Sequence, residues 1–150
     1  MPPARAVFAL LLAYAAFVVY GSLVPLDVHP LPLAEAWRRF EAMPFLQLGV
    51  ESRADWIANG VLYLPLGFLA AWWLLRCNWW QGAALMASVA GGVALALGVE
   101  FAQVFFPPRT VSLNDVMAEC IGTLLGASLA LVVHHRGRSV AAVRQAAGSW

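Results

Sequence analysis

A chain of 150 residues has the length of one domain, and its composition excludes most soluble proteins. Hydrophobic residues make up 62% of it and charged residues 11%, whereas ordinary soluble domains carry about 45–50% and about 25%. The mean hydropathy of +0.75 excludes disorder, and the formal net charge of +1 gives no reason to expect a nucleic-acid partner. We therefore expect a protein of the lipid bilayer.

Four segments are apolar for long enough to cross a membrane, which takes about 20 residues. In the first three segments, the uncharged runs between successive charged residues hold 21, 20 and 23 residues. The fourth is interrupted only near its beginning, by Asp115 and Glu119. The sequence thus predicts a single-domain, all-α membrane protein, a four-helix bundle with transmembrane helices at about 6–24, 54–75, 80–105 and 112–133.

The long connection at residues 25–53 contains a further helical pattern, LAEAWRRFEAM. Leu33, Trp37 and Phe40 fall on one stripe of such a helix, and the charged residues fall elsewhere. This pattern predicts a short amphipathic helix between the first and second spans, which either lies in the membrane interface or packs over the helix ends.

The distribution of arginine predicts how the bundle is oriented. Four spans place both termini on one side, which carries five arginines against four on the other, and the chain has no lysine. Cytoplasmic segments of membrane proteins carry an excess of basic residues. We therefore expect both termini, including a tail at residues 134–150, to be cytoplasmic.

The second and fourth spans open with the same spacing of polar residues, Ser-x-x-Asp followed four residues later by Asn or Glu. Ser52 and Ser112 stand at N-cap positions, so plain helix capping accounts for them. Capping does not account for Asn59 and Glu119, each of which lies one turn after an aspartate and on the same helix face. The third span carries further polar residues at the same end of the bundle.

The depth of these residues places them in two matching tiers, roughly 4–6 Å and about 9–11 Å inside the helix ends at about 1.5 Å per residue. An acid that faces hydrocarbon costs several kcal/mol, so we expect the side chains to face one another or a wet cavity. The predicted polar cluster consists of Asp55, Asn59, Glu100, Gln103, Arg109, Asp115 and Glu119.

Charge within this cluster is unbalanced. If its four acids were all ionised, Arg109 would leave a net charge of −3. We therefore expect that Glu100 or Glu119 is protonated at neutral pH, or that the cluster holds a cation. Because the acids follow no metal-ligand spacing, neither a metal site nor a cofactor is predicted.

Small residues predict where the helices approach one another. Gly122 and Gly126 form a GxxxG pattern on the stripe that carries Asp115 and Glu119. A stripe of small residues on the third span steps by four towards Glu100. We expect the third and fourth spans to pack closely there, with a homodimer contact as the alternative.

Proline predicts a bend in the second span. Pro65, followed by Gly67, removes one backbone donor and frees the carbonyl of Val61, so the helix should kink there.

Two stretches, DWIANGVLYLPLG from Asp55 and EFAQVFFPPRTVSLNDVMAECIGTLLG from Glu100, resemble the VanZ-like family of small bacterial membrane proteins. Glu119 departs from the family pattern, in which asparagine is usual. The positions that match the pattern are Asp55, Asn59, Pro65, Gly67, Glu100, Gln103, Arg109, Asp115, Gly122 and Gly126. The resemblance implies a multi-pass protein of the bacterial plasma membrane in a family associated with teicoplanin resistance.

Three functions fit the polar cluster. The chain could be an accessory protein of the cell envelope that binds a lipid headgroup or a lipid-linked precursor in an outward-facing pocket. It could be a membrane enzyme acting on such a lipid, with Glu100 or Glu119 as general acid or base and Arg109 steadying an anionic group. The cluster could also be a structural clasp between helices. We favour the first of these.

Overall fold

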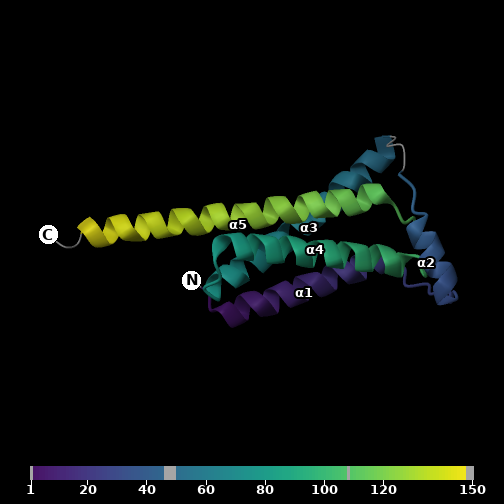
Figure 1. Cartoon of the computed structure of the whole chain (residues 1–150), viewed down its shortest axis with the longest axis horizontal. Coiled ribbons are helices and arrows are strands. Elements are labelled where there is room, and N and C mark those ends of the chain that lie inside the picture. The colour runs from purple at the N-terminus through teal and green to yellow at the C-terminus, as the bar shows by residue number, and fades with distance from the viewer. Residues whose placement is uncertain (1, 46–49, 108, 148–150) are drawn as a thin grey trace.

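The computed structural model describes residues 2–45, 50–107 and 109–147, and the side chains of 50–52, 138 and 140–147 lie outside the description. Five helices and no strand occur in the described residues (Figure 1). The helices are α1 (Ala4–Leu23), α2 (Leu33–Glu41), α3 (Val50–Arg76), α4 (Gln81–Gln103) and α5 (Leu113–Ala147). Four of them contain segments long and apolar enough to span a membrane, which confirms the predicted fold class.

Three helix ends differ clearly from the sequence prediction, and the first is the start of α3, at Val50 and not near residue 54. The α4 helix ends at Gln103 and not near residue 105, because the chain turns at residues 104–106 before Pro107, and residues that precede a proline avoid the helical conformation. The α5 helix continues to Ala147, so residues 134–147 extend the fourth span as a helix. This extension contains one glycine and no proline, and it is rich in good helix formers.

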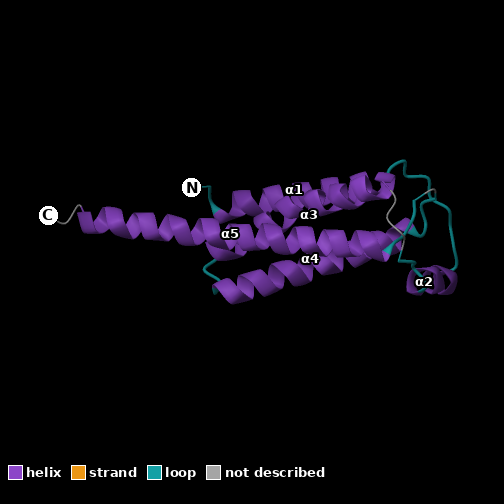
Figure 2. Ribbon diagram, turned by 90° about the horizontal axis from the view of Figure 1, so that it is seen from above, coloured by secondary structure: helices purple, strands orange, loops and turns teal. Residues whose placement is uncertain are grey.

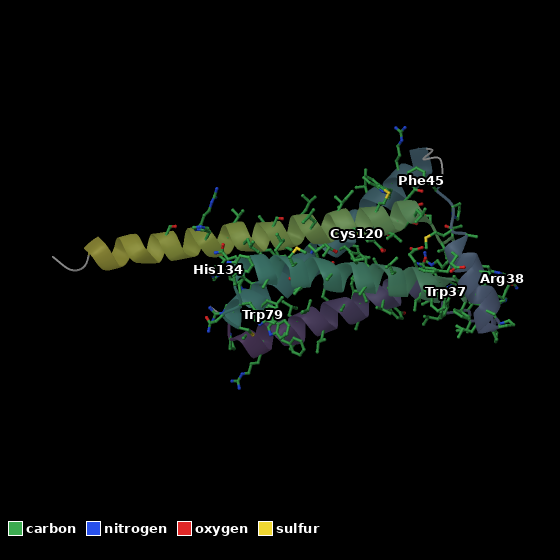
Figure 3. All side chains as sticks on the ribbon, in the orientation of Figure 1. Trp37, Arg38, Phe45, Trp79, Cys120 and His134 are labelled. Carbon is green, nitrogen blue, oxygen red and sulfur yellow. The ribbon has the colours of Figure 1, made fainter. Side chains whose placement is uncertain are left out.

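The long helices run side by side, with the two chain ends at one end of the molecule and α2 at the other (Figures 1 and 2). The α5 helix projects well beyond the other three at the end that carries the chain termini. Trp37 and Arg38 mark the α2 end, and Trp79 and His134 mark the opposite end (Figure 3). Both termini therefore lie on the same side of the bundle.

The α3 and α4 helices form the middle of the bundle. Each of them contacts α1, α5 and the other, whereas α1 and α5 make no contact with each other in the described part of the chain. Many large apolar side chains stay exposed on the outside, for example Phe17 at 57% and Met86 at 70%. Such a surface suits hydrocarbon and would be unfavourable in water.

Glycines bring the backbones of α3 and α5 together. A methyl group on Gly122 would collide with the carbonyl oxygen of Gly60, and one on Gly126 would collide with that of Leu64. The same is true of Gly67 against the Thr123 carbonyl. Gly122 and Gly126 were predicted to face the third span, which is α4, and this prediction is wrong. They face α3, the second span, within the same chain, and α3 offers small residues of its own.

The α4 helix does pack on α5, through a different residue of that helix. A methyl group on Gly92 would collide with the side chain of Thr123, which is fully buried. The stripe of small residues on α4 is buried over its whole length: Ala84, Ser88, Gly92 and Ala96. The third and fourth spans therefore pack closely, as predicted, but the contact is made by Thr123 and not by its neighbour Gly122.

Pro65 lies inside α3, and the helix continues across it. The hydroxyl of Tyr14 on α1 donates a hydrogen bond to the carbonyl of Leu62, at 2.9 Å. Proline removes the usual donor to the carbonyl of Val61, one residue earlier. A neighbouring helix thus supplies a polar partner next to the position where the α3 backbone lost one, as is common in membrane helices that contain proline.

The amphipathic helix α2 lies across the end of α4. Its Trp37 and Phe40 rings pack on Phe101, with ring centroids 5.9 and 5.4 Å apart, and Ala36 is fully buried. Backbone hydrogen bonds hold the connection at two further points, from His29 to Phe105 at 2.8 Å and from Leu113 to Pro44 at 3.1 Å. This helix therefore packs over the helix ends, as one of the two alternatives predicted.

Candidate functional site

A polar cavity of about 250 Å³ lies at the α2 end of the bundle. All four long helices contribute to its wall, together with the connection between α4 and α5. Six of the seven residues of the predicted polar cluster line it: Asp55, Asn59, Glu100, Gln103, Arg109 and Asp115. The remaining lining residues are Gly21, Ser22, Ala58, Leu62, Thr110, Ser112 and Asn114.

Asp115 joins α3 to the beginning of α5. Its Oδ1 atom accepts a hydrogen bond from the Asn59 amide at 2.8 Å, and its Oδ2 atom accepts one from the Ser112 hydroxyl at 2.7 Å. The Ser112 oxygen in turn accepts from the backbone N–H of Asp115 at 3.2 Å, which is the capping contact that the sequence predicted. The side chain of Ser52, for which the same contact is expected, lies outside the description.

Glu100 joins α4 to the same helix end. Its side chain is 1% exposed, and its Oε2 atom accepts a hydrogen bond from the backbone N–H of Ser112 at 3.0 Å. Helix N-termini carry unpaired N–H groups and a partial positive charge, so a carboxylate is favourable there. In a capping box this N–H is satisfied from within the helix, whereas here a neighbouring helix supplies the acceptor.

Gln103 and Arg109 bind the end of α1. The Gln103 amide donates to the carbonyl of Ser22 at 3.1 Å, and the Arg109 guanidinium donates to that of Gly21 at 3.0 Å. Both carbonyls belong to the last turn of α1, where backbone acceptors lack partners within the helix. The sequence did not reveal this contact, because no motif relates Gly21 or Ser22 to residues more than 80 positions away.

Glu119 lies outside the cavity wall, one helical turn further into the bundle than Asp115. It is 2% exposed, and its Oε2 atom is buried without a hydrogen-bond partner among the described residues. The hydroxyl of Tyr63, on a fully buried side chain of α3, lies next to the Glu119 carboxyl, so these two groups face each other inside the bundle. Sequence reasoning missed Tyr63, although its position one turn after Asn59 on the same helix face was a usable signal.

Carboxylates outnumber cations around the cavity. Asp55, Glu100 and Asp115 line it, and Arg109 is the one charged residue of opposite sign in its described wall. Asp55 is exposed, whereas Asp115 is half-buried. No group of three or more His, Cys, Asp or Glu side chains in the described residues is arranged to hold a metal ion.

A second cavity, of about 300 Å³, adjoins the first. The two cavities share Gln103 and Arg109 as lining residues. The charged or titratable residues around the second cavity are basic, namely His29, Arg39 and Arg109, and much of the remaining wall is apolar. The polar end of the bundle thus combines an acidic cavity and a basic cavity with Arg109 between them.

Comparison with known protein families found one match, to the VanZ/LLP1 family, over residues 7–134. This range includes every residue of the polar cluster and all four candidate membrane spans except short stretches at their outer ends. No curated protein matches the chain, and no solved structure does.

Proposed function

This chain belongs to the VanZ/LLP1 family, and from that premise we propose that it is an accessory protein of the bacterial cell envelope that binds a lipid headgroup or a lipid-linked precursor. The polar cavity would be the binding site. In this proposal the chain spans the plasma membrane with both termini in the cytoplasm, so the cavity faces outward. The single arginine of difference between the two sides supports that orientation.

The observation that carries the proposal is an open space among polar side chains at the end of four membrane spans. A polar space that opens to the surface is filled by water when no ligand is bound, and a polar headgroup can take the place of that water. Here about 250 Å³ remains. Pockets for drug-sized ligands hold roughly 300–1,000 Å³, so this cavity suits a headgroup and not a whole lipid.

The arrangement of the helices supports access for a lipid. The cavity has Ser22 on α1 and Asp115 on α5 in its wall, and it reaches the surface of the bundle at Asp55, which is exposed. The exposed apolar surfaces of the bundle would allow acyl chains to remain in the bilayer while a headgroup enters. A lipid-linked cell-wall precursor as the ligand would connect the chain with teicoplanin resistance.

Binding fits the lining better than catalysis does. The described wall contains no cysteine or histidine, and the hydroxyl of Ser112 is engaged in capping α5. The Ser112 oxygen is held from both sides, because it donates to Asp115 and accepts from the backbone N–H of the same residue, and Asn59 holds that aspartate in turn.

The structural clasp is the second candidate, and specific contacts favour it. Gln103 and Arg109 hold the end of α1, and Asn59 holds Asp115 across two helices. Such contacts would be useful whether or not a ligand binds. Binding and clasping differ in what they predict for Arg109.

Native mass spectrometry of the gently solubilised protein separates the two candidates. We expect the wild type to retain a lipid and Arg109→Ala to lose most of it, because Arg109 borders both cavities. Arg38→Ala is the matched control, since Arg38 carries the same charge on the outside of α2 and lines neither cavity. A wild type that carries no lipid, together with early melting of Arg109→Ala, would leave the clasp as the explanation.

A further inference from the structure

The surplus of carboxylates in the polar cavity restricts what its ligand can be. Three acids face one arginine, and one hydrogen bond of that arginine is already directed to the Gly21 carbonyl. Carboxylates accept hydrogen bonds and do not donate them while ionised. A ligand group that brings only negative oxygens would therefore meet repulsion over most of this wall.

A metal ion fits the cavity poorly as the balancing charge. The acids of the described wall surround a space of about 250 Å³, and they do not converge as a group that could hold a metal. Hard cations such as Mg²⁺ and Ca²⁺ need several oxygens within about 2.0–2.6 Å of one point. An ammonium needs fewer carboxylates close to it, because its N–H···O distances are about 2.7–2.9 Å and water can accept the N–H groups that no carboxylate reaches.

Glu100 gives an independent indication of a missing donor. Its side chain is 1% exposed, it lines the cavity, and among the described residues it accepts a hydrogen bond at Oε2 alone. Carboxylate oxygens inside a protein normally have partners, and the second oxygen of Glu100 has none among the described residues, so it is available to a donor that enters the cavity.

We infer that the ligand group which enters the polar cavity is a primary ammonium, whose N–H groups bind carboxylates of the wall and whose charge is balanced by Asp55, Glu100 and Asp115. This inference rests on the proposed headgroup-binding function and names the chemistry of the headgroup. An ammonium offers three donors and one positive charge. Ethanolamine headgroups and amino sugars carry such a group.

The adjoining basic cavity indicates what lies next to the ammonium. Arg109 belongs to both walls; Arg39 and His29 lie beyond it in the second cavity but are paired with Glu35 and Asp27, so Arg109 is the cation best placed for a phosphate. Arginine is well suited to phosphate oxygens, which it can bind in a fork. If a short linker joins a phosphate to the ammonium, the negative phosphate lies against Arg109 while the positive ammonium lies against the carboxylates of the polar cavity.

The test compares lipids that differ in one property. The full chain is placed in nanodiscs that contain equal amounts of phosphatidylethanolamine, phosphatidylcholine and phosphatidylglycerol, and the lipid retained on release is identified by native mass spectrometry. Phosphatidylcholine has the same charge as phosphatidylethanolamine but no N–H donor. We expect phosphatidylethanolamine to be enriched over both others by about tenfold, since hydrogen bonds to charged groups contribute that much to an affinity.

Asp55→Asn sharpens the comparison, because Asp55 lines the cavity, is exposed, and has no contact in the described structure on which folding would depend. The substitution should remove most of the preference for phosphatidylethanolamine. Glu41→Gln is the matched control: it removes the same charge at the same end of the molecule, from a residue on α2 that lines neither cavity. Its lipid preference should equal that of the wild type.

The outcomes separate this inference from the function on which it rests. Retention of phosphatidylglycerol or phosphatidylcholine as strongly as phosphatidylethanolamine would overturn the ammonium and leave lipid binding in place. Binding of soluble phosphoethanolamine in nanodiscs of phosphatidylglycerol, without retention of any lipid, would support the ammonium and overturn the lipid. Loss of the preference in Glu41→Gln as well as Asp55→Asn would show that overall charge, and not the cavity, selects the lipid.

Discussion

The two ends of the membrane-spanning part of α5 are held by different kinds of contact. From Gly122 onward the helix lies against α3 through glycines, with no room for a methyl group between the backbones. Around Asp115 the start of the helix is held by a hydrogen bond from Asn59 of α3 and by one that Ser112 donates to Glu100 of α4, and an open cavity remains. Close backbone packing leaves no space for a ligand, whereas hydrogen bonds between longer side chains hold helices apart. The difference shows how one bundle can be rigid along its length and hollow at one end.

The largest effect should come from filling the glycine contact. Gly122→Ala places a methyl group on the Gly60 carbonyl, so α3 and α5 must separate, and we expect a loss of about 3 kcal/mol in unfolding free energy, at the upper end for overpacked cores. Thermal melting in detergent measures it. Gly91→Ala is the control, because a methyl group there meets nothing within 4 Å. Equal melting of the two variants would contradict the close packing of α3 on α5.

An intermediate effect is expected at the polar end. Asp115→Ala leaves the Asn59 amide and the Ser112 hydroxyl without their acceptor, which should reduce the unfolding free energy by about 1–3 kcal/mol. Asp115→Asn retains one acceptor oxygen and should lose less. Chemical denaturation in mixed micelles can rank the three proteins. If Asp115→Ala proved as stable as the wild type, the polar contacts would not hold α5 in place.

The smallest effect is expected on the outside of the polar end. Arg39 and Arg38 both bind Glu35 on α2, and the hydrogen bond from Arg39, followed by the charge of Arg38, lowers the pKa of Glu35 below its usual value. Arg39→Ala should therefore raise the pKa of Glu35 towards that value and leave thermal melting unchanged, because the pair lies at the surface, with the Arg39 side chain 55% exposed. Carboxyl chemical shifts followed by NMR between acidic and neutral pH measure the pKa. An unchanged titration would mean that Arg39 does not act on Glu35.

Much of this architecture could be predicted because it depends on properties of single segments. Apolar runs of about 20 residues must form helices in a bilayer, since no water is present to satisfy the backbone. Buried acids inside such runs must find polar neighbours, which brings Glu100 and Asp115 to one place. What the pattern could not supply was the choice between two neighbours of α5, because the stripe that carries Gly122 borders both α3 and α4.

Details of the site were harder to predict for a related reason. The contacts of Gln103 and Arg109 with the α1 carbonyls join positions far apart in the chain, and backbone carbonyls leave no mark in a sequence. Tyr63 was overlooked because a tyrosine in an apolar run resembles any other core residue, although its hydroxyl is buried beneath the cavity region.

The sequence by itself determined that the chain forms four apolar spans, a short amphipathic helix, and acids and amides gathered at one end, because each of these depends on local composition and helical period. Only the tertiary structure decided that glycines of α5 meet α3, that α1 ends on Gln103 and Arg109, and that a cavity of about 250 Å³ stays open between the polar side chains. These outcomes depend on how several helices fit together in three dimensions, and volume left between surfaces is a property of no single segment.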